Sequence, residues 1–325
     1  MDKNQQRYLD FLNWFNKKME NYEFPKEPKE FYEPIKYALS GTAKRLRPAI
    51  LTLVGESYGI DKNDLFPASM AIEMIHNFSL VHDDIMDNDL QRHGQDTVHK
   101  KWNENIAILI GDGIYTLAIK ELLFYSSSKY YEISKILLES ITQVCEGQSF
   151  DMEFANREKI TADEYLKMVE KKTGYLLSAS AVIGAIIGGA SKSEQNVIEK
   201  YMLSLGKIFQ IQDDLLEITA SSEKMGKSLG SDLAEGKKTF PVLIGYKLAS
   251  KKQKEKLELL LNKSDISMEN IKSFRNLMVE IGVINEIEKF IQMEKLNSKT
   301  LLKQLPKKVS KAIELFSEMI FNRQK

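Results

Sequence analysis

Apolar residues recur along most of the chain at intervals of three and four positions. Ile72 and Ile75 follow this spacing near residue 80, and Ile284, Ile287 and Ile291 follow it near the C-terminus. Positions three and four apart lie on the same face of an α-helix, whereas a strand would place apolar residues at alternate positions. The pattern therefore predicts long amphipathic helices.

Residues that punctuate turns are scarce in the middle of the chain. No proline occurs in the 173 residues between Pro67 and Pro241. A strand-rich protein would need frequent turns, so we expect an all-α fold. A polar, proline-bearing linker is expected at 21–34, a glycine-rich loop at 226–236 and another turn at 262–267.

Composition narrows the class of protein. The 325 residues are 43% hydrophobic and carry 46 basic and 46 acidic side chains. This is enough apolar material for a folded core and too much for a disordered chain. A zero net charge argues against nucleic acid as a partner, because binding to phosphate backbones needs an excess of Lys and Arg.

The apolar run Tyr175–Ala190 and the one cysteine bear on location. The run has sixteen residues, whereas a membrane-spanning helix needs about 20, so we expect a buried helix and no transmembrane segment. Cys145 has no cysteine partner in the chain, which excludes an intramolecular disulfide and fits a cytoplasmic location. We expect its side chain to be buried as a small hydrophobe.

Two segments share an acidic pattern. The segment 78–87 ends in DDIMD and the segment 209–217 ends in DDLLE, with first aspartates 130 positions apart. Acids at i and i+4 share a helix face and repel one another, so a cation should compensate them. Carboxylate oxygens suit Mg²⁺, which completes its coordination with water and phosphate oxygens. The predicted metal-binding residues are Asp83, Asp84, Asp87, Asp213, Asp214 and Glu217.

Basic residues accompany both acidic motifs. They are Lys44, Arg45 and Arg47, then Arg92 with His93, Lys171 and Lys172, and Lys227, Lys237 and Lys238. Together they could clamp two diphosphate groups, one of them also bridged to the acids by metal ions.

At these positions the chain resembles trans-isoprenyl diphosphate synthases of the polyprenyl synthetase family. The resemblance covers 34–249 and its motifs occur in order: KRLRP at 44–48, EMIH at 73–76, DDIMD at 83–87, Arg92, Gly147-Gln148 with Asp151, Lys172-Thr173, FQIQDD at 209–214, and GKKT at 236–239.

The resemblance implies a role for each of these residues. Lys172, Thr173 and Gln210 would be catalytic and would lie along the ionising carbon of an allylic diphosphate. That diphosphate would be bound by Arg92, Lys172, Thr173, Gln210, Lys227 and Lys237. Isopentenyl diphosphate would be bound by Lys44, Arg47, His76 and His93.

The resemblance also implies an architecture and cofactors. We expect a single isoprenoid-synthase domain over 1–325, with an N-terminal helix and linker at 1–33, a motif-bearing core at 34–249 and C-terminal helices at 250–325. It would be one large bundle of mostly antiparallel helices around a deep central cavity. About three Mg²⁺ ions in each active site and a homodimer are implied as well.

Five positions depart from the family pattern. Thr42 and Ala43 replace two glycines, and Asp96 stands where proline is common. His93 replaces an arginine, which would make one isopentenyl diphosphate contact sensitive to pH. Glu217 replaces an aspartate and keeps its charge with a longer reach.

Product length is predicted from residues just before the first motif. Phe78 is aromatic, Ser79 beside it is small, and Ile75 lies near the same helix face. One aromatic at this place resembles archaeal-type geranylgeranyl diphosphate synthases. We therefore expect condensation of isopentenyl diphosphate with dimethylallyl, geranyl or farnesyl diphosphate to the C20 product; a farnesyl or a longer-chain synthase is the alternative.

Three other classes explain less of the sequence. A histidine-aspartate phosphohydrolase leaves the second acidic motif unexplained, and a terpene cyclase would carry a different second motif. A non-catalytic synthase subunit would have lost an acidic motif, and both are intact.

Overall fold

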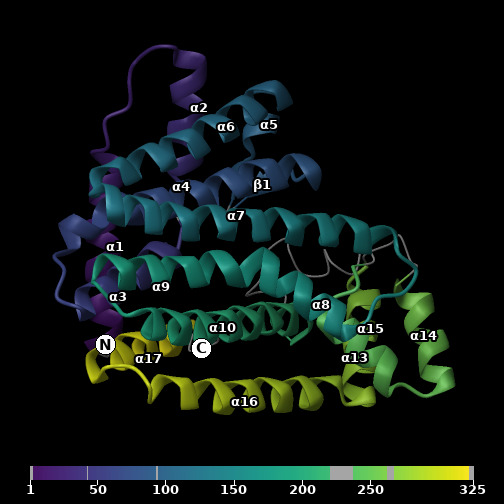
Figure 1. Ribbon diagram of the computed structural model, residues 1–325. Helices are drawn as coiled ribbons and strands as arrows, with labels where there is room; N and C mark the ends of the chain where they lie inside the picture. The colour runs from purple at the N-terminus through teal and green to yellow at the C-terminus, as the bar shows by residue number, and fades with distance from the viewer. Residues whose placement is uncertain (1–2, 42, 93, 220–236, 262–266, 322–325) are drawn as a thin grey trace. The chain divides into compact units, whose positions relative to one another are not determined.

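A computed structural model of the chain describes residues 3–41, 43–92, 94–219, 237–261 and 267–321. Nearly all of this is helical, and the strands β1 (Gln91–Arg92) and β2 (Gln95–Asp96) form one short antiparallel pair. The all-α class predicted from the sequence is confirmed (Figure 1). The helices are α1 (Lys3–Glu20), α2 (Lys29–Leu39), α3 (Leu46–Ser57), α4 (Lys62–Met86), α5 (Val98–Lys101), α6 (Glu104–Glu121), η1 (Leu122–Phe124), α7 (Ser127–Asn156), α8 (Ala162–Val169), η2 (Glu170–Gly174), α9 (Tyr175–Ile187), α10 (Lys192–Thr219), α13 (Phe240–Leu248), α14 (Lys251–Leu261), α15 (Met268–Ile281), α16 (Val283–Leu302) and α17 (Lys307–Phe321).

The chain forms two compact units. The first unit contains Met1–Ile141, Leu176–Glu199 and Lys303–Lys325, and the second contains Thr142–Tyr175 and Lys200–Leu302. The first acidic motif belongs to the first unit and the second acidic motif to the second unit. The expected single domain over 1–325 stays a prediction.

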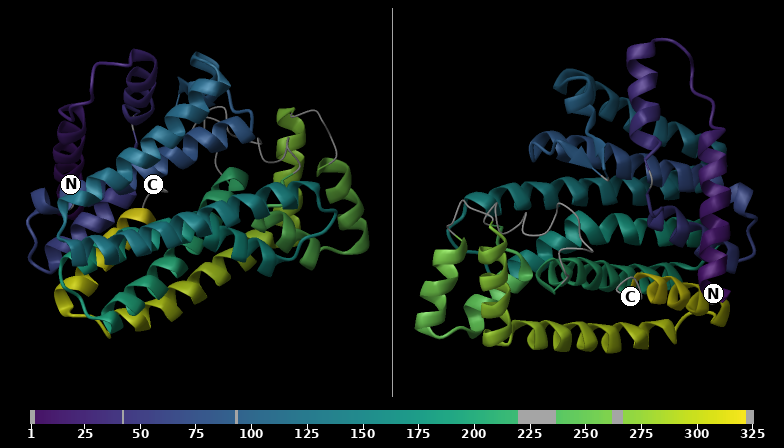
Figure 2. Two further views of the ribbon diagram at one scale, coloured as in Figure 1. Left: turned by 45° about the horizontal axis from the view of Figure 1, so that its top comes forward. Right: turned by 180° about the vertical axis from the view of Figure 1, so that it is seen from behind.

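Helix α4 is the centre of the first unit. It packs most extensively against α6, which lies beside it in both views, and also against α3 (Figures 1 and 2). Residues from Leu65 to Ile75 are buried on almost every side of the helix. A helix that is apolar all round belongs in a core, so α4 carries the first acidic motif on a rigid support.

The apolar run at 175–190 forms the buried helix that the sequence predicts. All residues of α9 from Leu176 to Ile187 are buried. A Cβ atom at Gly184 would lie 2.3 Å from the carbonyl oxygen of Leu51 in α3, so only glycine permits this approach of two backbones. Among the described residues, no helix combines the length and apolarity needed to cross a membrane.

Helix α13 organises the second unit. It contacts α8, α15 and α16, and the green helices α13, α14 and α15 are grouped in Figure 1. The ring of Phe240 lies between Tyr165 and Phe290, with centroid distances of 6.2 and 5.2 Å. Thr239 and Pro241 begin α13, where the missing N–H of proline costs nothing.

Three sequence expectations differ from the structure or lie outside it. The linker expected at 21–34 is shorter, because α2 begins at Lys29 and includes Pro34. Cys145 is exposed, so its expected burial was wrong; it lies in a helix whose sequence does not say which face is covered. The glycine-rich loop at 226–236 lies outside the described residues except for its border at Lys237.

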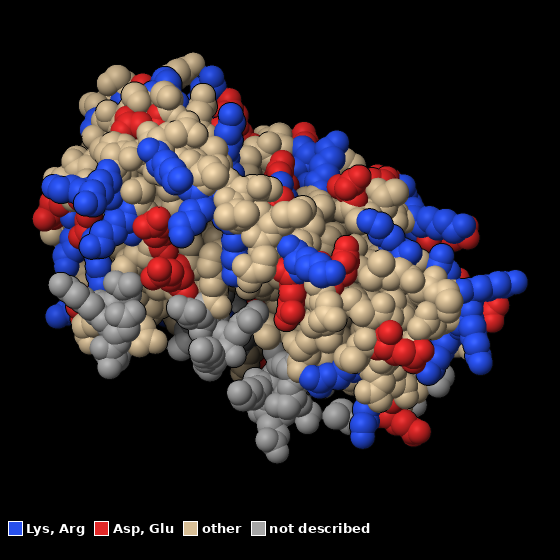
Figure 3. Space-filling view, turned by 90° about the horizontal axis from the view of Figure 1, so that it is seen from below, with Lys and Arg blue, Asp and Glu red and all other residues tan. Residues whose placement is uncertain are grey.

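Charged side chains of both signs are intermixed over the face seen in Figure 3. On this face the described Lys and Arg side chains alternate with Asp and Glu and with uncharged residues, so no single-sign field dominates it. The balanced charge of the sequence is thus matched by a mixture of both signs on this face.

Replacing Gly184 by alanine should destabilise the first unit. The new Cβ would overlap the Leu51 carbonyl oxygen, and overpacking typically costs about 1–3 kcal/mol, more than the roughly 1 kcal/mol that alanine gains in helix propensity. Urea denaturation would measure the free energy of unfolding. Gly245→Ala is the matched control, because its nearest neighbour is the flexible Met278 side chain. Equal stability of Gly184→Ala and wild type would contradict the close approach.

Candidate active site

The first acidic motif lies at the C-terminal end of α4. Asp87 caps the helix, and its side chain is exposed, while Asp83 one turn earlier is half-buried. The last carbonyl groups of a helix carry partial negative charge, so these carboxylates face repulsion from each other and from the helix end. A cation bound beside them would relieve this repulsion.

Asp84 points into the first unit, away from its two neighbours in the motif. It is 4% exposed, and its carboxylate accepts a hydrogen bond from Nε of Arg92 in β1. Burial raises the pKa of the Asp84 carboxyl to about 6, while Arg92 beside it lowers that pKa. Arg92 also contacts Asp89 at 3.2 Å, so the β1–β2 turn holds this cation beside the first motif.

Two of the residues predicted to bind isopentenyl diphosphate are in contact. Nη1 of Arg47 lies 3.1 Å from Nε2 of His76. Burial lowers the pKa of the Arg47 guanidinium to about 10, although the charge of Glu73 acts against this shift. Lys44 is exposed, three positions before Arg47 on the same loop-to-helix segment. His93 lies outside the described residues.

One open hollow of the first unit is lined by three residues whose predicted roles differ. His76, Asp84 and Arg92 all line it, together with Tyr37 and Thr97. These three side chains were predicted to bind isopentenyl diphosphate, metal and allylic diphosphate, respectively. They come from α4 and β1, so one rigid helix and one tight turn hold them together.

The residues predicted to set product length lie on α4, one to two turns before Asp83. Ile75 is buried, whereas Phe78 and Ser79 are half-buried. The Phe78 ring makes T-shaped contacts with His82 and with Tyr115 of α6, at 4.9 and 5.5 Å between centroids. Phe78 is therefore held by a second aromatic ring from the neighbouring helix.

Lys172 and Thr173 occupy a π-helical turn in the second unit. The turn η2 joins α8 to α9, and such single turns are frequent at functional sites. Nζ of Lys172 lies 2.7 Å from Asp151, and the Thr173 hydroxyl donates to Oε1 of Gln210 at 3.4 Å. The three residues predicted to be catalytic thus belong to one cluster formed by η2, α7 and α10.

Two glycines allow the neighbouring helices to approach this turn closely. A Cβ at Gly147 of α7 would lie 2.4 Å from the backbone nitrogen of Lys172, and one at Gly206 of α10 would lie 2.7 Å from Cα of Gly174. Any larger residue at either position would displace backbone. The position of Lys172 and Thr173 is therefore fixed by main-chain packing on both sides.

The second acidic motif repeats the division seen in the first. Asp213 is exposed and Glu217 is half-buried, whereas Asp214 is 5% exposed. The Asp214 carboxylate accepts hydrogen bonds from the Tyr165 hydroxyl at 2.6 Å, Nε2 of Gln210 at 3.1 Å and the Phe240 backbone N–H at 3.4 Å. In both motifs the second aspartate is buried and held by protein donors, whereas the first acid and the acid four positions later are half-buried or exposed.

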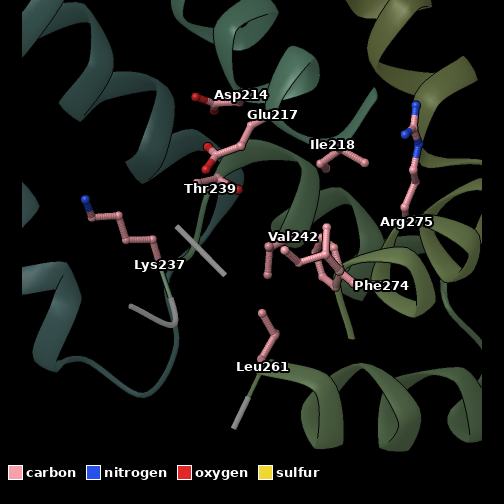
Figure 4. Close-up of a pocket in the computed structure, with 10 residues that line it drawn as sticks. Asp214, Glu217, Ile218, Lys237, Thr239, Val242, Leu261, Phe274 and Arg275 are labelled. Atoms are coloured by element: carbon pink, nitrogen blue, oxygen red, sulfur yellow. The ribbon is translucent and has the colours of Figure 1, made fainter. Parts of the chain in front are cut away.

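A small hollow beside this motif has one polar and one apolar side. In Figure 4 the carboxylates of Asp214 and Glu217 lie near Thr239, while Val242, Leu261 and Phe274 form the apolar part. Lys237 borders the same hollow and is exposed. Lys227, the other predicted lysine of this region, lies outside the described residues.

The donor set fits Mg²⁺ bound jointly by protein and ligand. Every candidate ligand is a carboxylate, the donor that Mg²⁺ prefers. Among the described residues, no group of three or more His, Cys, Asp or Glu side chains could hold a metal ion by itself. One or two carboxylates with phosphate oxygens would complete the coordination of each ion.

Sequence reasoning missed Tyr165 and Tyr115. Tyr165 hydrogen-bonds Asp214, and Tyr115 packs on Phe78. Each acts across a tertiary contact: Tyr165 is 49 positions from Asp214 along the chain, and Tyr115 is 37 positions from Phe78. Neither belongs to a motif, so no local pattern indicates its partner.

Comparison with known proteins places the chain in a family. A sequence model described as Polyprenyl synthetase matches residues 28–278. A relative from Methanosarcina mazei, named geranylgeranyl diphosphate synthase, is 39% identical over 80% of this chain and 79% of that protein. A relative from Natronomonas pharaonis, named geranylfarnesyl diphosphate synthase, is also 39% identical, over 67% of this chain and 69% of that protein.

A solved structure agrees with these matches. The geranylgeranyl pyrophosphate synthetase of Pyrococcus horikoshii superposes with a TM-score of 0.89 and 31% identity, over 99% of both chains. The sequence resemblance and the all-α fold are both confirmed by it. This chain belongs to the polyprenyl synthetase family and is a prenyltransferase.

Proposed function

We propose that the protein condenses isopentenyl diphosphate with an allylic diphosphate to geranylgeranyl diphosphate. The observation that carries this proposal is the shared design of the two acidic motifs, each with one buried aspartate fixed by protein donors and two acids that are half-buried or exposed. A pair of such motifs suits a substrate that carries a diphosphate bridged by metal ions.

The acidic residues divide into two roles in this proposal. Asp83, Asp87, Asp213 and Glu217 would hold about three Mg²⁺ ions on the allylic diphosphate. Asp84 and Asp214, which accept hydrogen bonds from Arg92 and Tyr165 respectively, would orient the motifs and add to their negative charge. Bound Mg²⁺ supplies neutralisation of the negative charge that the leaving diphosphate acquires.

The chain's own residues position and protect the reaction. The allylic C–O bond breaks, and the diphosphate leaves with the electron pair. The isopentenyl double bond then forms the new C–C bond with the allylic cation, and a proton passes to the released diphosphate. Lys172, Thr173 and Gln210 supply pre-oriented polar groups beside the ionising carbon, at no reorganisation cost because the glycine contacts fix η2.

The basic residues and His76 and His93 would bind the two diphosphate groups at separate sites. Arg92, Lys227 and Lys237 would bind the allylic diphosphate. Lys44, Arg47, His76 and His93 would bind isopentenyl diphosphate, and the contact of Arg47 with His76 supports a shared anion site. Charge-assisted contacts from a planar guanidinium suit a diphosphate.

Phe78 would limit the growing chain at twenty carbons, with Ser79 and Ile75 shaping the wall beside it. Its contact with Tyr115 supports a fixed floor, because a ring held on two sides cannot swing aside easily. A farnesyl or longer-chain product is the alternative. The relative named geranylfarnesyl diphosphate synthase, whose name states a longer product, supports the longer-chain form of it.

A single isoprenoid-synthase domain over 1–325, a deep central cavity, a homodimer and a cytoplasmic location belong to the same proposal. Ile108 and Leu109 of α6, 48% and 51% exposed, support an additional covering partner. Sedimentation analysis of the purified protein tests the dimer directly.

Product analysis tests the proposed reaction. The protein is incubated with Mg²⁺, isopentenyl diphosphate and one of the three allylic primers, and the products are identified. A prenyl diphosphate lengthened by five-carbon units is expected. Cyclised hydrocarbon, release of phosphate alone or no product would point instead to a cyclase, a phosphohydrolase or a non-catalytic subunit.

Variants of the second motif should lose activity in a graded order. Asp213→Asn should lower turnover by more than about 100-fold, because it removes a proposed ligand, and Tyr165→Phe should lower it by about 10-fold, because it only loosens Asp214. Turnover measured over a Mg²⁺ titration checks both. Asp163→Asn, an exposed acid of α8, is the control. Near-normal turnover of folded Asp213→Asn would refute the metal assignment.

Variants around Phe78 should change the product. Wild type should stop at C20, Phe78→Ala should continue to longer chains, and Ser79→Phe should stop at C15. Chromatography of the dephosphorylated products measures this directly. An unchanged product from Phe78→Ala would show that another side chain forms the floor.

A further inference from the structure

Arg45 differs from the two basic residues on either side of it. Its backbone adopts the left-handed conformation with φ 45°, which is uncommon for a residue other than glycine. Its side chain is buried, with 5% of the residue exposed, whereas Lys44 is exposed and Arg47 is half-buried. A strained residue at the start of α3 must be held by its surroundings.

The guanidinium of Arg45 is almost fully used by the protein. Nη1 bonds to Oε1 of Glu73 in α4, which is 1% exposed. Nη2 donates to the carbonyl oxygens of Leu39 at 3.0 Å and Gly41 at 2.9 Å, and Nε donates to Asn16 at 3.4 Å. The planar guanidinium thereby joins the end of α2, the following turn, α4 and α1.

Helix α1 holds the same turn from a second point. The Tyr8 hydroxyl donates to the backbone carbonyl of Lys44, the residue directly before Arg45. Tyr8 and Asn16 lie two helical turns apart on α1, so the N-terminal helix spans the segment that carries Lys44.

Glu73 connects this anchor to the other side of the proposed anion site. It lies one turn before His76 on α4, and His76 contacts Arg47. Nε of Arg47 is buried and has no hydrogen-bond partner among the described residues. The anchor therefore fixes the backbone on both sides of a guanidinium that still has a donor to offer.

We propose that Arg45, with Glu73 and Tyr8, is a positioning residue for isopentenyl diphosphate. It does not touch the substrate; it locks the left-handed turn that presents Lys44 and Arg47. The inference rests on the proposed assignment of Lys44, Arg47 and His76 to that substrate.

Two variants test this with the full-length protein and saturating Mg²⁺. Arg45→Lys keeps the charge beside Glu73 but cannot make the forked contacts, so the KM for isopentenyl diphosphate should rise about tenfold or more. Tyr8→Phe removes one hydroxyl, and the same KM should rise about fivefold. The KM for the allylic substrate and kcat should change by less than about twofold, because the anchor positions only the isopentenyl diphosphate site. Partial unfolding would give a different result: it would lower kcat and leave both KM values unaltered.

Arg7→Gln is the matched control, since Arg7 precedes Tyr8 on α1 and its ion pair, at 3.2 Å, is with half-buried Glu56 and not with the turn that carries Lys44. It should leave both KM values unchanged. If Arg45→Lys does not fold by circular dichroism, Tyr8→Phe decides alone. An unchanged KM for isopentenyl diphosphate in the folded variants overturns the inference, whereas absence of any product from wild type overturns the proposed function instead.

Discussion

Carboxylates that stand four positions apart on a helix repel one another, and this repulsion governs both acidic motifs. The first motif stands at the C-terminal end of α4, and the second lies on the long helix α10. Each turns one aspartate inward to protein donors, while its other two acids are half-buried or exposed. Bound cations would offset the repulsion among these carboxylates, which links the motifs to metal chemistry.

The donors that hold the two buried aspartates differ in charge. Asp84 faces a cation, Arg92, on a two-stranded turn, whereas Asp214 faces the neutral hydroxyl, amide and backbone N–H of Tyr165, Gln210 and Phe240. Removing a charged partner and removing a neutral one from a buried carboxylate carry different penalties. Among the described residues Arg92 is the one hydrogen-bond donor to the Asp84 carboxylate, so the first motif is the more sensitive of the two to loss of one partner.

Helical periodicity was enough to predict the fold class, the buried helix α9 and the common face of each acidic motif. The pattern could not reveal that α2 begins inside the expected linker, because Pro25 and Pro28 read locally as loop while Pro34 is accommodated within the helix. The pattern also could not predict which residues contact and hold the candidate site residues. Tyr165, Tyr115 and Glu73 act through tertiary contacts, and spacing along a chain carries no information about partners tens of residues away.

The π-helical turn η2 has a consequence for how the chain can change. A π turn holds about one residue more than an α turn, so the segment Glu170–Gly174 amounts to a single inserted residue within a continuous helical run. Because the wider turn takes up the extra residue, the residues that follow it keep the faces they would present in an uninterrupted α-helix. A residue inserted into α9 without such a turn would instead rotate the residues after it by about 100° about the helix axis, and because α9 is buried on nearly every side this would mismatch its packing.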